Sequence, residues 1–284
     1  YLREPMSIII SRLSLLSRNK RRAAPSCSLP LGGRNRYLRF LGALVSMLAL
    51  AHGTAIAAPA ANAGGTLGYY RMPVAHGEHL WFVAEGDIWQ ANLQGGSAQR
   101  ITTHPAGESG PSVSPDGRWL AFVGSYEGTQ DAYIMPAAGG VPKRLTYDGA
   151  NIRVWGFSAN GEVLVTSPTL KGLPGTSLVL IDPKTGLRRA LPVAQASDGA
   201  ISPDGRTLYF TRSGLRGDNA RAYRGGAMAQ LWQLDLTSEQ EARPLLPAKA
   251  AELGNMRRPM PYRDAQNQTR VAFLSDRDGR YNLW

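Results

Sequence analysis

Two places in this sequence come closest to catalytic or metal-binding patterns. One is a serine near a glycine, Ser158, and the other is a pair of histidines, His76 and His79. Ser158 lies in Gly156-Phe-Ser-Ala-Asn160, which lacks the last glycine of the G-x-S-x-G turn that presents a nucleophilic serine. His76 and His79 do not follow the H-E-x-x-H order that binds zinc from a helix, and we expect their segment to precede the first strand. The sequence also contains no phosphate loop and no dinucleotide fingerprint. We therefore predict no catalytic residue, no metal site and no cofactor in this chain.

One segment has residue types suited to binding. Residues 213–229 lengthen one interval of an otherwise regular repeat, and they contain Tyr223, Arg224, Gly225 and Gly226 in succession. Adjacent glycines let the backbone turn sharply, while an aromatic ring and a guanidinium group supply stacking and carboxylate pairing. We predict that this loop lies at one mouth of the domain and meets a peptide or a neighbouring domain. A solvated structural turn is the alternative.

The elements that must position this loop recur at a fixed spacing. The turn Ser114-Pro-Asp-Gly117 returns as Ser158-Ala-Asn-Gly161 and Ser202-Pro-Asp-Gly205, so that the first residues are 44 apart both times. A second marker, Gly-Gly followed by Arg-Ile-Thr or Arg-Leu-Thr, keeps the same interval at 95–102 and 139–146. A period of this size is typical of repeat architectures. Asp-Gly and Asn-Gly supply the positive φ that tight hairpins need.

Strand-like segments lie between the two markers. Runs rich in β-branched and aromatic residues occupy equivalent places at 87–93, 131–135, 177–182 and 230–235. Each unit contains four antiparallel strands within about 40–45 residues, which predicts a blade of a β-propeller. We expect an all-β propeller over residues 73–284, incomplete, with about four and a half blades and almost no helix. Its leading strands are expected to begin near His79, Arg118, Glu162, Arg206 and Thr269.

The N-terminal region has a different composition. Residues 1–63 hold nine basic residues and one acid, which leaves only +3 of the net charge of +11 for the rest of the chain. A nucleic-acid-binding role needs a basic face on the folded domain. The remaining charge gives little support for such a role, and we expect no nucleic-acid partner.

The basic region has the order of a secretory signal peptide. Arg34, Arg36 and Arg39 precede the apolar run 40–51, which small residues follow. We predict a signal-peptide helix within a leader at 1–63, cleavage near Ala57 or Ala63, a linker at 64–72, and a periplasmic or secreted protein. An uncleaved anchor over 40–63 is the alternative, so contact with a membrane is expected only through this segment.

The repeat markers also resemble those of known families. The order S-P-D-G-R-x-L-A-F, D-x-W/Y and G-G-x-x-x-R-L-T resembles the propellers of the Tol-system periplasmic protein and of several serine peptidases. Tyr223-Arg-Gly-Gly226 before Leu231-Trp232 more narrowly resembles the N-terminal six-bladed propeller of tricorn-type proteases. The opening from Met72-Pro73 to Asp87-Ile-Trp89 is similar to the first blade there, so the likeness extends over about residues 72–284.

The resemblance implies a fragment of a large serine peptidase that trims oligopeptides. In that family the propeller is non-catalytic and serves as a channel or filter, so its expected partners are peptides and the protein's own downstream peptidase domains. The resemblance also implies a sixth blade, a homo-oligomer and, by analogy with its archetype, a cytoplasmic location as the alternative to secretion. The propeller of a prolyl-oligopeptidase-like enzyme and a Tol-type protein-binding propeller remain alternative functions.

Overall fold

A computed structural model describes residues 68–169, 175–212, 225, 227–247, 249 and 254–284. The predicted leader, its cleavage sites and residues 64–67 of the predicted linker lie outside these residues. The described strands all belong to the unit Gly68–Trp284.

The described residues form nineteen strands in five antiparallel sheets, and within each sheet the strands pair in the order of the sequence. The first two sheets contain β1 (Arg71–His76), β2 (His79–Ala84), β3 (Asp87–Asn92), β4 (Gln99–Arg100), β5 (Glu108–Val113), β6 (Trp119–Gly124), β7 (Asp131–Pro136) and β8 (Lys143–Arg144). The third and fourth contain β9 (Arg153–Phe157), β10 (Val163–Ser167), β11 (Ser177–Ile181), β12 (Arg188–Ala190), β13 (Asp198–Ile201), β14 (Thr207–Arg212), β15 (Gln230–Asp235) and β16 (Arg243–Pro244). The fifth contains β17 (Met256–Arg263), β18 (Thr269–Ser275) and β19 (Asn282–Leu283).

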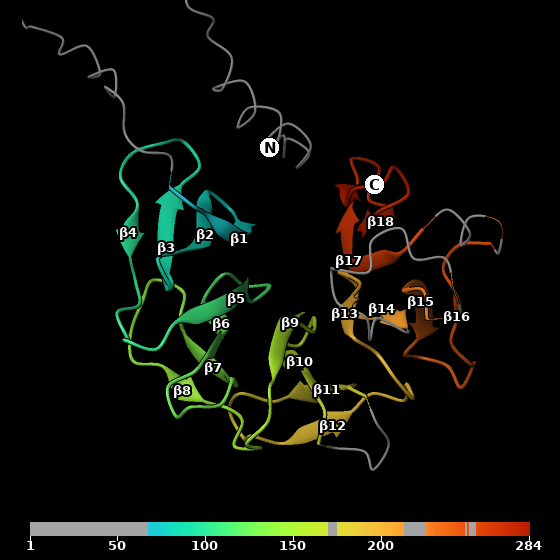
Figure 1. Cartoon of the computed structure of the whole chain (residues 1–284), viewed down its shortest axis with the longest axis horizontal. Coiled ribbons are helices and arrows are strands. Elements are labelled where there is room, and N and C mark those ends of the chain that lie inside the picture. The colour runs from blue at the N-terminus through green and yellow to red at the C-terminus, as the bar shows by residue number, and fades with distance from the viewer. Residues whose placement is uncertain (1–67, 170–174, 213–224, 226, 248, 250–253) are drawn as a thin grey trace, which may run out of the picture. The chain divides into compact units, whose positions relative to one another are not determined.

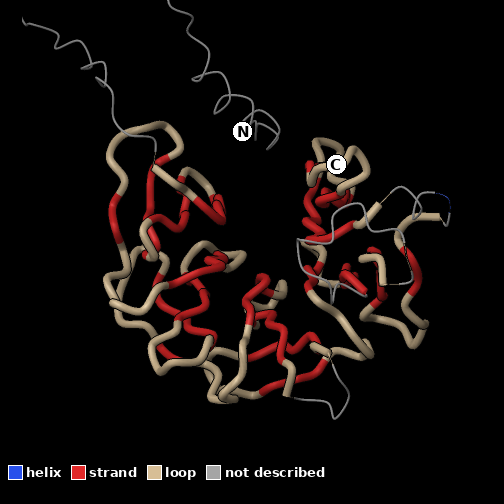
Figure 2. Tube along the Cα trace, viewed as in Figure 1, coloured by secondary structure: helices blue, strands red, loops and turns tan. Residues whose placement is uncertain are grey.

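The five sheets follow one another around an arc, as the blades of a propeller do (Figure 1). The first strands of successive sheets, β1, β5, β9, β13 and β17, contact one another in that order. Strands and connecting loops account for nearly all of the described residues (Figure 2). The predicted all-β propeller is therefore confirmed, with four sheets of four strands and one of three.

The repeated turns occupy equivalent places between the first and second strands of the second, third and fourth sheets. Gly117, Gly161 and Gly205 have φ angles of 73°, 83° and 76°, in the left-handed region that glycine enters at no steric cost. The backbone N–H of each glycine donates to the carbonyl of the serine that opens its turn. These contacts confirm the hairpin geometry expected from the Asp-Gly and Asn-Gly pairs.

The expected order of strands within a blade needs one correction. The strands that we expected to lead each unit, β2, β6, β10, β14 and β18, are second in their sheets. Two of the true first strands carry mostly small and polar residues, Glu-Ser-Gly-Pro-Ser-Val in β5 and Asp-Gly-Ala-Ile in β13, so their apolar alternation is weak. The segment from His76 to His79 was expected to precede the first strand. It instead forms the turn between β1 and β2, where His76 pairs with His79.

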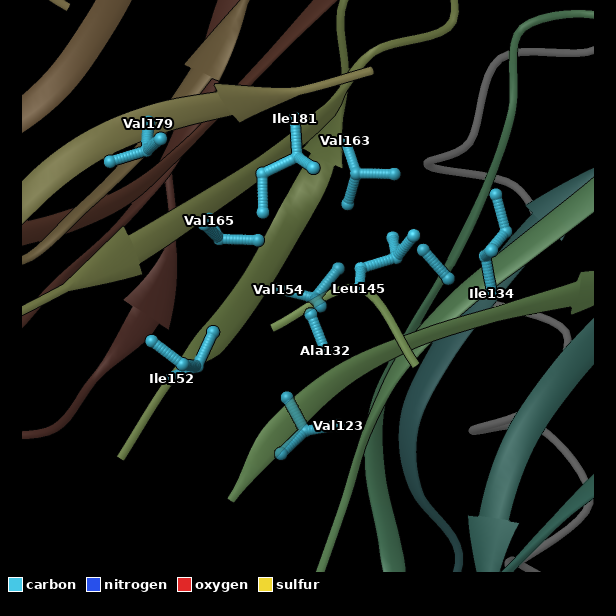
Figure 3. Packing of buried hydrophobic residues seen from close by; sticks show 11 residues of the cluster. Val123, Ala132, Ile134, Leu145, Ile152, Val154, Val163, Val165, Val179 and Ile181 are labelled. Atoms are coloured by element: carbon cyan, nitrogen blue, oxygen red, sulfur yellow. The ribbon is translucent and has the colours of Figure 1, made fainter. Parts of the chain in front are cut away.

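The core consists of apolar layers between neighbouring sheets. Alternate residues of a strand point to opposite faces, so each sheet contributes to the layer before it and to the layer after it. Val123, Ile134, Val154 and Val165 belong to the layer between the second and third sheets (Figure 3). Trp81 and Phe122 pack between the first and second sheets. The sheets are thus held face to face, and their first strands remain at the inner side of the arc.

Candidate functional site

The loop predicted to bind a ligand lies almost entirely outside the described residues. This holds for Tyr223, Arg224 and Gly226, whereas Gly225 is half-buried and its carbonyl accepts the backbone N–H of Met228 at 3.0 Å. The loop joins β14 to β15, whose ends meet in the pairing of Arg212 with Gln230. Its role therefore stays a prediction.

Ser158 is a turn residue in the structure. It is buried, its hydroxyl donates to Oε2 of Glu162 at 3.1 Å, and its Oγ accepts the Glu162 backbone N–H at the same distance. A nucleophilic serine needs a base within hydrogen-bonding reach that removes its proton. Glu162 instead serves to close the turn between β9 and β10.

The inner side of the arc carries a set of charges that we did not predict. On the five first strands, every exposed charged side chain is an arginine, namely Arg71, Arg153, Arg258 and Arg263. Within the described residues, Arg153 and Arg258 have no carboxylate partner. Guanidinium groups recognise carboxylates by paired hydrogen bonds.

The two acidic residues of the first strands are buried and held by hydroxyl groups. Glu108 accepts the Thr102 hydroxyl at 2.9 Å and the Tyr126 hydroxyl at 2.7 Å. Asp198 accepts the Thr211 hydroxyl, and the Arg258 backbone N–H approaches it at 3.4 Å. Both carboxylates stabilise contacts within and between sheets, and the charges of Arg258 and Arg257 also act on Asp198.

Bulges shape the inner strands of four sheets. In the third sheet the pairing shifts at Trp155. In three others it shifts between Arg71 and Val74, between Ser109 and Ser112, and between Arg257 and Met260. Each of these three bulges contains a residue with left-handed φ followed by proline, which are Met72-Pro73, Gly110-Pro111 and Arg258-Pro259.

The bulges change where inner side chains point. A bulge bends its strand and redirects the side chain, and proline leaves one ladder position without a donor. The Gly110 N–H donates to Sδ of Met72 at 3.1 Å, which links the inner strands of the first two sheets. A proline within the first strand of three sheets is the signal in the sequence that could have located this edge.

Glu108 is expected to make stability depend on pH. Burial raises the pKa of Glu108, and the hydrogen bonds from Tyr126 and Thr102 oppose this rise only in part. The charge of Asp87 raises the pKa further, and that of His104 lowers it. A carboxyl whose pKa is higher in the folded state contributes stability at low pH that is lost as pH rises through that pKa. Glu108→Gln should therefore gain stability relative to the unmodified chain as pH rises from acidic to neutral.

Urea unfolding of both proteins across this pH range measures the difference. Parallel profiles for Glu108→Gln and the unmodified chain would contradict the prediction.

The described residues provide no clear metal site. They contain no group of three or more histidine, cysteine, aspartate or glutamate side chains arranged to hold an ion. Over the same residues, no helix is both long and apolar enough to cross a membrane.

The five face-to-face sheets, with their first strands at the inner side, define a β-propeller domain. Residues 67–284 match the family described as the tricorn protease N-terminal beta propeller domain. The chain belongs to this family.

Individual relatives agree with this assignment. Tricorn protease homolog 1 of Streptomyces coelicolor is 32% identical over 218 residues, which cover 76% of this chain and 20% of the relative. This chain thus spans about a fifth of that protein. The crystal structure of the tricorn protease superposes with a TM-score of 0.62 at 21% identity, covering 76% of this chain and 21% of that one. A TolB structure from Agrobacterium tumefaciens shares the fold, with a TM-score of 0.57, 20% identity and coverage of 77% and 81%.

Proposed function

We propose that this propeller is the non-catalytic N-terminal part of a secreted tricorn-like serine peptidase that degrades oligopeptides. In this role it is a channel or filter through which peptide substrates or products pass. Its partners are peptides and the protein's own peptidase domains, in a homo-oligomer. Membership of the tricorn propeller family supports the peptidase role, and the order of charged, apolar and small residues in 1–63 supports secretion.

The inner edge is the observation that carries the channel proposal. A surface that peptides pass must offer them contacts without holding them by many hydrogen bonds. Arg153 and Arg258 are exposed there, while the acidic groups Glu108 and Asp198 are buried. Such an edge attracts peptides with acidic side chains more strongly than basic ones, because the charges act over about 10 Å at ordinary ionic strength.

Reversing the inner charges tests this role. The double variant Arg153→Glu, Arg258→Glu is expected to bind a labelled acidic peptide about tenfold more weakly, because two attractive guanidinium groups become repulsive. Binding of a basic peptide of equal length should strengthen. Fluorescence anisotropy with both peptides measures the change, at low and at high salt.

The matched control carries the same charge change on outer strands. Lys143 lies on β8 and Arg243 on β16, and both are exposed. The variant Lys143→Glu, Arg243→Glu should alter binding much less than the inner variant. Equal effects from both variants would show that net charge alone matters, and the channel proposal would then be abandoned.

A further inference from the structure

Asparagine replaces aspartate in one of the three repeated turns, and the hydrogen bonds differ there. In the other two turns, Oδ1 of Asp116 and of Asp204 accepts the hydroxyl of the serine two residues earlier, at 2.5 Å. The same oxygen accepts the backbone N–H of the residue two positions later at 3.1 Å. The aspartate carboxylate thus closes both turns.

The third turn is closed without its asparagine. Ser158 bonds to the side chain and the backbone of Glu162, in place of the residue at position 160. The Asn160 side chain is exposed and has no hydrogen bond to any other described residue. No side-chain hydrogen bond therefore fixes Cγ of Asn160 at a distance from the backbone nitrogen of Gly161.

The following residue suits a known reaction of asparagine. Asn160-Gly161 is the one Asn-Gly pair among the 284 residues. A Cβ built on Gly161 would meet no heavy atom within 4 Å, so the space beside its Cα is open. Glycine also lacks the side chain that hinders ring closure in other Asn-X pairs.

We propose that Asn160 is a site of spontaneous deamidation. The backbone nitrogen of Gly161 attacks Cγ of Asn160, a new N–Cγ bond forms, and the Cγ–Nδ2 bond breaks. The proton from the Gly161 N–H leaves with the amide nitrogen as ammonia. Water then opens the cyclic imide at either carbonyl, which yields aspartate or isoaspartate. No oxidant or reductant takes part.

The fold controls how fast this step occurs. The Gly161 N–H donates to the Ser158 carbonyl at 3.0 Å, so the nitrogen becomes available only when the turn opens. The turn joins β9 to β10, where Phe157 pairs with Val163. Deamidation in the folded chain is therefore slower than in the unfolded chain, and faster than at asparagines followed by larger residues.

The two products have different consequences. An aspartate at position 160 matches the residue type that closes the turns at Asp116 and Asp204. An isoaspartate inserts one more carbon into the backbone between β9 and β10, in a turn where Gly161 already has φ of 83°. The first product keeps the turn, and the second disturbs the pairing of the third sheet.

Peptide mapping by mass spectrometry tests the proposal. The purified chain is held at mildly alkaline pH and sampled over time, with methyltransferase labelling to detect isoaspartate. Asn160 is expected to deamidate about tenfold faster than Asn92, before Leu93, and Asn267, before Gln268, because only its neighbour lacks a Cβ. Both comparison sites are exposed. Equal rates at the three sites in the folded chain would overturn the proposal.

Two variants separate chemistry from structure. Asn160→Ser should abolish the fast isoaspartate signal while the chain remains folded. Asn160→Asp should retain the melting temperature of the unmodified chain or raise it, because its carboxylate can accept the bonds that Asp116 accepts. A signal that persists in Asn160→Ser would place the modified residue elsewhere and reject Asn160 as the site.

Discussion

Replacing Arg144 by alanine is expected to reduce the free energy of unfolding by about 3–5 kcal/mol, because the change strands a buried charge. Asp131 is fully buried, and Arg144 donates to its Oδ2 at 2.7 Å. The Thr146 hydroxyl donates to Oδ1 at 2.8 Å, and Thr146 Oγ1 in turn accepts the backbone N–H of Ala132 at 2.9 Å. Without the guanidinium group, the carboxylate keeps only neutral hydrogen bonds, from the hydroxyls of Thr146 and of Thr129 (2.9 Å to Oδ2), and loses its opposite charge.

An ion pair with both partners partly exposed provides the control. Arg263 lies 3.1 Å from Asp204, and their side chains are 36% and 35% exposed, against 22% and 0% for Arg144 and Asp131. Water can replace a partner at such a site, so Arg263→Ala should cost only about 1 kcal/mol. Urea unfolding at neutral pH measures both losses. Similar losses for the two variants would show that burial of the carboxylate does not govern the cost.

Trp81→Ala is expected to cost about 3–5 kcal/mol, because a large buried side chain leaves a cavity between two sheets. Trp81 is only 2% exposed and packs in the layer between the first and second sheets. Its indole N–H also donates to the Ala137 carbonyl at 2.9 Å, a bond that joins the two sheets directly. The loss therefore combines apolar contact with an unpaired carbonyl group.

Trp119 provides a control of the same residue type. It begins β6 in the second sheet and is 44% exposed. Trp119→Ala should change the free energy of unfolding by no more than about 0.5 kcal/mol, as exposed sites usually do. Trp81→Phe separates the two contributions, since it keeps most of the volume and removes the N–H donor. A loss for Trp119→Ala as large as that for Trp81→Ala would contradict the layered packing.

Local features of the sequence were sufficient to predict the repeat and most of its strands. The Gly at 117, 161 and 205 marks hairpins because a left-handed backbone is strained for other residues, and this requirement holds in any surrounding. The strands Asp87–Asn92 and Gln230–Asp235 were recognisable because each contains a tryptophan next to an aliphatic residue, with polar residues between the apolar ones. Both signals are contained within a few residues.

The order of the strands and the burial of charged side chains depend instead on how neighbouring sheets pack against each other. The second strand of each sheet was predicted to be the first. The residues of β5 and β13 are mostly small and polar, so these strands are defined by their contacts with neighbouring first strands. Asp87 and Asp131 start equivalent strands, yet only the second is fully buried by its surroundings. The exposure of Arg153 and Arg258 likewise follows from their place at the inner edge.

The sequence by itself therefore determined the all-β repeat and its turns, because backbone strain and side-chain alternation act locally. The tertiary structure decided the starting strand of each sheet, the burial of its carboxylates and the inner row of arginines. These properties arise only when successive sheets pack face to face, since packing determines which side of each strand loses contact with water.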